Sequence, residues 1–192
     1  DSIGKTNWVT SVRKNLYMNG FGYILENQSN INYILFLSQY TQRLKDQYVQ
    51  SWRANVENNR RLCTLKDIKT YFIREPYVSA IDVGKFRKCM VKFRCSSHSL
   101  MIEKGKHYNI LLDDRNCVYC ESCLEDEFHF VMICPLYHDL RLKYFEDYFL
   151  QDVHYTKFCT LLSSENTTTI RNLAMYLFYA FEMRSIFLNG RE

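Results

Sequence analysis

Four residues in one short stretch have the chemistry of a metal site. Cys117 and Cys120 form a Cys-x2-Cys pair, and His129 and Cys134 follow as His-x4-Cys. Thiolate and imidazole are the usual ligands of tetrahedral zinc, and Cys3His is a common structural set. Two cysteines three residues apart share a tight turn, so both sulfurs can reach one ion. Because four protein ligands leave no open position, the spacing predicts a structural Zn2+ site.

Neighbouring residues leave the ligand set open at two points. Cys123 extends the motif to Cys-x2-Cys-x2-Cys and could replace His129 or Cys134 as a ligand. We interpret it as an exposed neighbour, because the charged segment 125–127 follows closely. His138 is a weaker alternative, one helical turn after Cys134. Buried free thiols, or a redox Cys-x2-Cys pair, are the other interpretations; a redox pair would need a βαβ context that this region lacks.

Composition sets the compartment that we expect. The chain has 192 residues and opens DSIGKTNWV, with neither the basic start nor the apolar core of a signal peptide. No apolar run approaches the roughly 18 residues of a membrane span. We therefore expect an intracellular protein with no membrane contact, where clustered cysteines bind metal rather than form disulfides. The net charge of +4 permits nucleic-acid binding without requiring it. Since the chain lacks an initiator Met, we interpret it as a piece of a longer protein.

The first half of the chain has helical periodicity. Apolar spacing predicts helices over residues 6–19 and 31–56. Thr64-Leu-Lys-Asp67 has the pattern of a capping box, which predicts a helix that Pro76 ends. Another helix is predicted over 80–95. These elements form a helical region over residues 1–95.

The pattern changes after residue 95. Residues 107–113 and 128–133 are predicted as two short strands of a β-hairpin that carries the zinc ligands. Pro135 suits the start of a helix, and the last helix is predicted over 169–188. The expected fold is mostly α, a helical domain with a small β-hairpin zinc knuckle inserted between helices. Its parts are the helical region, a zinc-knuckle region over 96–150 and a C-terminal helix region over 151–192, packed as one compact unit.

Basic residues gather around this knuckle. Lys85, Lys88 and Lys92 fall within about 60° of one another on a helical wheel, beside an apolar face. Such a stripe can follow phosphates, although a solvated helix face has the same pattern. Tyr119 lies between two ligands, where it could stack on a base or pack over the zinc. His98 could add to this basic surface, but we favour its interpretation as a capped or hydrogen-bonded core imidazole. The candidate nucleic-acid contacts are Lys85, Lys88, Lys92, Arg94, Lys104, Lys106, His107, Arg115 and Tyr119.

Several motifs occur in an order typical of one family. They are RCSSHSLMIEKGK at 94–106, RNCVYC at 115–120, LEDEFHF at 124–130 and CPLYHDLR at 134–141. In these motifs, and more weakly in its flanks, the chain resembles the C-terminal region of non-LTR retrotransposon endonuclease–reverse transcriptases. Two departures stand out. Lys106 occupies a position where the family usually has Arg, and Cys123 is not part of its usual ligand set.

The resemblance implies a function for this region. Cys117, Cys120, His129 and Cys134 would bind zinc, and the module would hold template RNA or target DNA during target-primed reverse transcription in the nucleus. The upstream polymerase domain would be its neighbour. No catalytic constellation is found in this piece, and Leu-Leu-Asp-Asp at 111–114 is interpreted as a polar turn, so we expect no enzyme activity. The alternative is a zinc scaffold that docks on the polymerase domain or a partner protein and contacts no nucleic acid.

Overall fold

The chain is mostly helical, as the sequence predicts. The computed structural model describes residues 7–27, 31–59, 61–121 and 123–190. In these ranges the only β-structure is one antiparallel bridge between Asn116 and Leu124, so the predicted β-hairpin is not seen. The chain divides into two compact units, residues 1–55 and residues 56–192. This boundary lies inside the helical region that the sequence suggested.

Unit 1 begins with two helices joined by a tight turn. These are α1 (Trp8–Met18) and α2 (Tyr23–Glu26), and α3 (Tyr33–Asn58) follows them. Asn7 caps α1, because its side-chain oxygen accepts a hydrogen bond from the Thr10 N–H at 2.8 Å. The two long helices agree with those predicted over 6–19 and 31–56.

An aromatic cluster holds the start of α3 in unit 1. The ring of Phe21, in the turn before α2, lies 5.6 Å from that of Phe36 and 5.3 Å from that of Tyr40, in both cases edge to face. Leu16 of α1 and Ile24 of α2 are the buried aliphatic residues among those described in this unit. Unit 1 is thus held by a small core made from all three of its helices.

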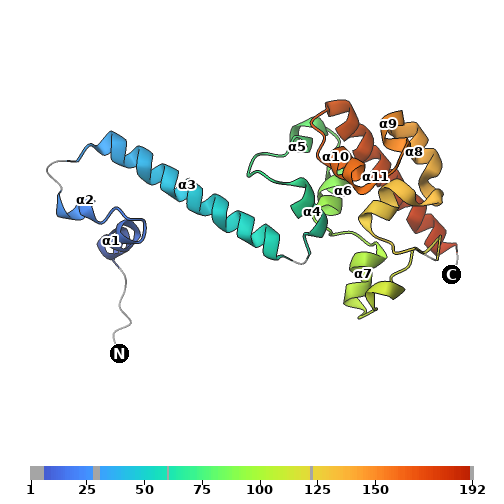
Figure 1. The fold of residues 1–192 in the computed structure, drawn as a ribbon, viewed down its shortest axis with the longest axis horizontal. Helices are drawn as coiled ribbons and strands as arrows, with labels where there is room; N and C mark the ends of the chain where they lie inside the picture. The colour runs from blue at the N-terminus through green and yellow to red at the C-terminus, as the bar shows by residue number, and fades with distance from the viewer. Residues whose placement is uncertain (1–6, 28–30, 60, 122, 191–192) are drawn as a thin grey trace. The chain divides into compact units, whose positions relative to one another are not determined.

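Unit 2 is a bundle around one long helix. Its elements are α4 (Cys63–Ile68), α5 (Tyr77–Ala80), α6 (Gly84–Arg94), α7 (Met101–His107), η2 (Leu112–Asp114), η3 (His129–Ile133), η4 (Pro135–Tyr137), α8 (His138–Tyr144), α9 (Asp147–Leu150), α10 (Tyr155–Leu162) and α11 (Thr167–Asn189). Helices α5, α6, α8 and α10 pack on α11 (Figure 1). Leu173, Leu177 and Ala180 lie one helical turn apart on the buried face of α11, and this spacing explains its central place.

The start of α4 differs from the predicted capping box. Helix α4 begins at Cys63, two residues before the start at Leu65 that a Thr64 cap implies, and no side chain caps it. Thr64 is buried inside the helix instead. Pro76 does not end this helix, which stops at Ile68; it precedes α5, where its fixed φ suits a helix start.

Both predicted strands are helical or turn segments. Helix α7 continues to His107, and Asn109 then takes a left-handed conformation (φ 54°) that leads toward η2. The second predicted strand is the π-helix η3. Four successive residues of η3, 129–132, are buried, so the segment shows no strand-like alternation of exposure. A short apolar run of this kind does not distinguish strand from helix by periodicity.

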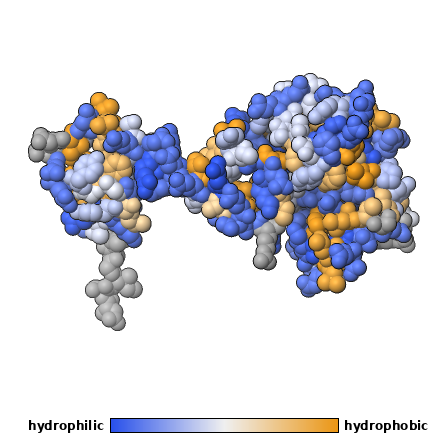
Figure 2. All heavy atoms as spheres, in the orientation of Figure 1, coloured by the Kyte–Doolittle hydropathy of each residue, from blue (hydrophilic) through white to orange (hydrophobic). Residues whose placement is uncertain are grey.

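The surface is mixed in character. Figure 2 shows one face of the molecule, on which hydrophilic residues predominate and separate hydrophobic patches interrupt them. Tyr71, Leu111 and Ile186 are among the exposed large apolar side chains of unit 2. Among the described helices, none combines the length and the apolar character that a membrane span requires.

Candidate metal centre

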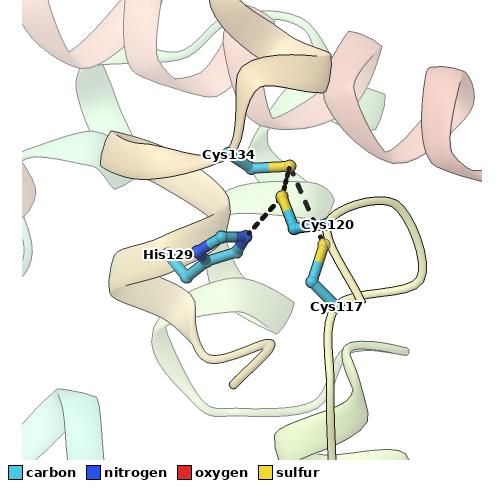
Figure 3. Close-up of side chains that lie close together, drawn as sticks. All are labelled: Cys117, Cys120, His129 and Cys134. Atoms are coloured by element: carbon cyan, nitrogen blue, oxygen red, sulfur yellow. Dashed lines mark hydrogen bonds between the residues drawn. The ribbon is translucent and has the colours of Figure 1, made fainter. Parts of the chain in front are cut away.

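Four ligand atoms converge where the loop of Cys117 and Cys120 meets η3. His129 is the first residue of η3, and Cys134 directly follows its last residue. The sulfurs of Cys117, Cys120 and Cys134 and a ring nitrogen of His129 all lie within 4.8 Å of one another (Figure 3). Cys117, His129 and Cys134 are buried, and Cys120 is half-buried. The spacing predicted this convergence, and these four residues could bind a metal ion.

The separations suit a tetrahedral ion. The Cys134 sulfur lies 3.8 Å from the sulfurs of Cys117 and Cys120, and the Cys120 sulfur lies 3.6 Å from His129 Nε2. A tetrahedral centre with metal–sulfur bonds of about 2.3 Å and a metal–nitrogen bond of about 2.0 Å needs S···S distances of ~3.8 Å and S···N distances of ~3.6 Å. These three separations therefore match those of ligands that share one tetrahedral ion.

The loop that carries the first two cysteines closes on itself. The Cys117 N–H donates to the Cys123 carbonyl at 2.7 Å, and the Glu121 N–H donates to the Cys117 carbonyl at 2.9 Å. Glu121 takes a left-handed conformation (φ 58°), which reverses the chain. Cys123 is exposed and contributes its carbonyl to the loop, and His138 is exposed at the start of α8. Neither belongs to the cluster found among the described residues.

A π-turn places the other two ligands. The Cys134 N–H donates to the His129 carbonyl, five residues back, at 2.8 Å. This wide turn brings residues five apart to one side of the helix, so both side chains face the same point. The Asp126 carboxylate accepts a hydrogen bond from the His129 N–H at 2.7 Å and thereby fixes the start of the turn. The ligand pair thus projects from a π-helix rather than from a strand.

The three cysteine thiols of the cluster differ in the direction of their pKa shifts. Hydrogen bonding from Cys134, opposed by burial and aided by His129, lowers the pKa of Cys117 to about 3. The hydrogen bond to Cys117, together with burial, raises the pKa of Cys134. Burial also raises the pKa of Cys120. One thiolate therefore forms readily, and an ion must displace protons from the other two sulfurs to bind all three.

A buried ion pair attaches this loop to α11. Arg184 donates two hydrogen bonds to the Glu125 carboxylate, at 2.8 and 2.7 Å, and the two side chains are 4% and 1% exposed. The same carboxylate accepts from the Met101 N–H of α7 at 2.7 Å. Arg141 of α8 donates to the Cys134 carbonyl at 2.7 Å. Both sides of the metal cluster are therefore held by buried guanidinium groups.

Sequence reasoning missed this pair. The acidic segment around Glu125 was interpreted as a charged neighbour of an exposed cysteine, but Glu125 and Glu127 are both buried. One signal was available in the last helix. Arg184 continues the spacing of Leu177 and Ala180 on the buried face of α11, and an Arg in that register needs a buried partner.

The interpretation of His98 as a core imidazole is confirmed. Its side chain is 2% exposed, and Nε2 lies 3.0 Å from a Glu127 carboxylate oxygen that also accepts from the Ser96 hydroxyl at 2.9 Å. Burial raises the pKa of Glu127, but the hydrogen bond and charge of His98 outweigh it, so the net shift is downward. This cluster joins the turn after α6 to the segment before η3.

Two predicted phosphate contacts have partners inside the protein. Arg94 is buried and donates to the Glu75 carboxylate at 2.6 Å and to the Leu162 carbonyl at the end of α10. Arg115 is half-buried and donates to the Ile110 carbonyl at 2.8 Å. Both guanidinium groups therefore stabilise unit 2 through internal hydrogen bonds. The sequence pattern, which showed only their charge, did not indicate this role.

The residues near the loop are partly engaged. Lys106 forms an ion pair with Glu103, which lies three residues earlier on α7. Lys104 is exposed, with its ammonium 5.9 Å from the ring centre of Tyr108, and His107 is exposed at the end of α7. Tyr119 is 42% exposed and packs edge to face on Phe187 at 5.3 Å. The ring is thus partly packed and partly accessible.

The three lysines of α6 are the most available charges of the predicted set. Lys85, Lys88 and Lys92 are all exposed. None forms an ion pair with a carboxylate of the described ranges. The Lys85 ammonium also lies over the rings of Phe86 and Phe178, at 5.1 and 4.5 Å. The helix thus carries a row of three exposed lysines that have no carboxylate partner among the described residues.

Comparison with protein-family models, with curated proteins and with solved structures finds no match for this chain. Its function is therefore inferred from the side chains, their geometry and the resemblance of its motifs.

Proposed function

We propose that this chain is the nucleic-acid-binding C-terminal module of a non-LTR retroelement reverse transcriptase. In this proposal the module holds template RNA or target DNA during target-primed reverse transcription, in the nucleus. Polymerase and endonuclease sites would lie in upstream parts of the parent protein, and the module itself would not be an enzyme. The observation that carries the proposal is the exposed, unpaired lysine row of α6 in the same unit as the metal cluster.

Zinc is the ion that we assign to the cluster. Three sulfurs and one imidazole form a set that zinc binds in structural sites, and the separations of 3.8 and 3.6 Å suit its bond lengths. Four protein ligands leave no position for a substrate, so the ion would fix the loop rather than catalyse a reaction. It would hold the loop of Cys117 and Cys120 against η3.

The lysine row would supply the phosphate contacts. Lys85 and Lys92 are seven residues apart, which corresponds to about 10 Å along a helix. Charges over that distance can face more than one phosphate of a single strand. Lys104 and His107 would extend this surface, and Arg94 and Arg115 would act through packing.

Binding titrations in increasing salt test the proposal. The zinc-loaded chain is titrated with a structured RNA and a nicked duplex, and the triple substitution Lys85→Gln, Lys88→Gln and Lys92→Gln is compared with it. The plot of log affinity against log salt has a negative slope. For every phosphate that the variant no longer neutralises, the magnitude of this slope should decrease by about 0.7 to 0.9. Lys143→Gln, on α8 and outside the lysine row, is the control for charge alone. Flat salt dependence, or no binding to either nucleic acid, would remove the proposal.

The alternative is a zinc scaffold that docks on another protein domain. It is favoured by exposed apolar residues on α3, where Ile34, Leu37 and Leu44 are 84%, 58% and 43% exposed. An apolar stripe of this kind suits a partner surface, and the upstream polymerase domain is the partner that the resemblance implies. If Leu37→Gln abolishes reverse transcription by the parent protein, and the lysine substitutions leave that activity unchanged, docking is favoured over nucleic-acid binding.

A further inference from the structure

A groove of about 580 Å³ lies between α6 and the C-terminal half of α11. The α6 side carries the three exposed lysines. The half-buried rings of Phe178 and Phe181 lie at its base, and Glu182 of α11 stands on the opposite rim. Sites of this size take small organic groups rather than whole helices. The groove therefore combines one basic wall, an aromatic base, the loop residues 97–99 with His98, and a single carboxylate.

The charges of the groove select an anionic ligand. Three lysines face one glutamate, so the groove has a surplus of positive charge. The Lys85 ammonium lies 4.5 Å from the centre of the Phe178 ring, which places this cation directly above the base. An anion bound at the lysines would thus bring any group attached to it into contact with the aromatic base.

The aromatic base suits a flat group. Phe181 stacks on Phe130 with the ring centres 4.6 Å apart, and the Lys85 ammonium covers Phe178. These rings offer edges more than free faces, and ring edges pack favourably on the face of another π system. A nucleobase can enter such a groove only when it is unpaired, because bases in a duplex remain stacked and paired.

We infer that this groove holds one unpaired, amino-bearing base of a single strand whose phosphates lie on Lys85, Lys88 and Lys92; the inference rests on the proposed nucleic-acid function. Glu182 selects which base binds, because a carboxylate accepts a hydrogen bond from an exocyclic amino group such as cytosine N4. Thymine and uracil present the O4 acceptor at that position, which the carboxylate repels. The groove therefore prefers cytosine to thymine.

Short single strands of matched size test the inference. The zinc-loaded chain is titrated with an oligo(dC) and an oligo(dT) of equal length and with a blunt hairpin duplex, by fluorescence anisotropy and by amide NMR shifts. The oligo(dC) should bind roughly fivefold tighter than the oligo(dT), the low end for one hydrogen-bonded base contact. Its shifts should concentrate on α6 and the C-terminal half of α11, and the duplex should leave the groove amides unmoved.

Two substitutions separate the base contact from the charge. Glu182→Gln should remove or reverse the preference, because the amide can donate to thymine O4. Ser185→Trp fills the groove from the exposed side of α11 without altering the core and should weaken oligo(dC) binding about fivefold or more, the scale of one base-specific contact. Lys143→Gln, a charge change outside the groove, should keep the cytosine preference.

The outcomes distinguish this inference from the proposed function. Equal binding of oligo(dC) and oligo(dT), unchanged in Glu182→Gln, overturns the inference, as does full oligo(dC) affinity in Ser185→Trp. If salt-dependent duplex or RNA binding persists in those cases, the proposed function stands without the groove. If no nucleic acid binds, both fail. Groove shifts with an acidic leucine-rich peptide, but not with oligo(dC), identify a protein-docking groove and also overturn the inference.

Discussion

Substitution of Glu125 by Gln should destabilise unit 2 more than the same kind of substitution at an exposed carboxylate. Gln keeps the size and an acceptor oxygen for the Met101 N–H, so the main change is the lost charge. Arg184, 4% exposed at its side chain, would keep a buried positive charge without its counter-charge. Removing one partner of such a pair costs about 3–5 kcal/mol, mostly from the uncompensated charge.

A matched control is available on the same helix. Arg171 of α11 pairs with Asp82 at 2.8 Å, but these side chains are 50% and 76% exposed. Asp82→Asn makes the same chemical change beside the same kind of guanidinium. Because water and salt screen this pair, we expect a cost of about 0–1 kcal/mol. The comparison isolates burial as the cause of the difference.

Amide hydrogen exchange is the suitable assay, because it reports on each of the two units by itself. Exchange at Leu173 and Leu177, in the buried centre of α11, reports the opening of unit 2 directly. Adding Arg184→Met to Glu125→Gln should restore part of the loss, since it removes the stranded charge. If Glu125→Gln costs no more than Asp82→Asn, or the double variant is less stable than the single one, the reasoning from burial is wrong.

Three further predictions concern the loop and its support. Cys117→Ser should lose one equivalent of bound zinc in elemental analysis, whereas Cys123→Ser should retain it; equal loss would place Cys123 among the ligands. Zinc affinity, measured by competition with a chelator, should rise with pH across the neutral range, because two ligand thiols have raised pKa values and their protons compete with the ion; pH-independent affinity would contradict this. Gly105→Ala should destabilise unit 2 by about 1–3 kcal/mol in amide exchange, because the new Cβ would lie 2.7 Å from the side chain of Arg115. Gly84→Ala, which meets nothing within 4 Å, should stabilise by roughly 0.4–1 kcal/mol, and a cost equal to that of Gly105→Ala would refute the steric argument.

The metal cluster could be predicted from the sequence because its information is local. Cys117 and Cys120 lie three residues apart, and His129 and Cys134 lie five apart, so short-range geometry brings each pair together. The chemistry of sulfur and imidazole then favours one shared ion. The interpretation of Cys123 as an exposed neighbour agrees with the structure, in which its carbonyl closes the loop and its side chain is exposed.

The segments around the ligands could not be predicted in the same way. Residues 128–133 are apolar enough to form a buried strand or a buried helix, and only their packing in unit 2 selects the π-turn. The helix over 80–95 was predicted four residues too early, since α6 begins at Gly84. Helices α1, α3 and α11 were found because their apolar spacing persists over several turns.

The sequence by itself determined the helical class and the four candidate metal ligands, because periodicity and ligand spacing are properties of neighbouring residues. Only the tertiary structure decided what each charge does. Arg94 and Lys92 lie on the same helix, yet Arg94 is buried against Glu75 and Lys92 faces solvent. Glu125 likewise became the buried partner of Arg184, 59 residues away. The role of a charge depends on its desolvation and on its partner, and both are set by contacts between residues that are distant in the chain.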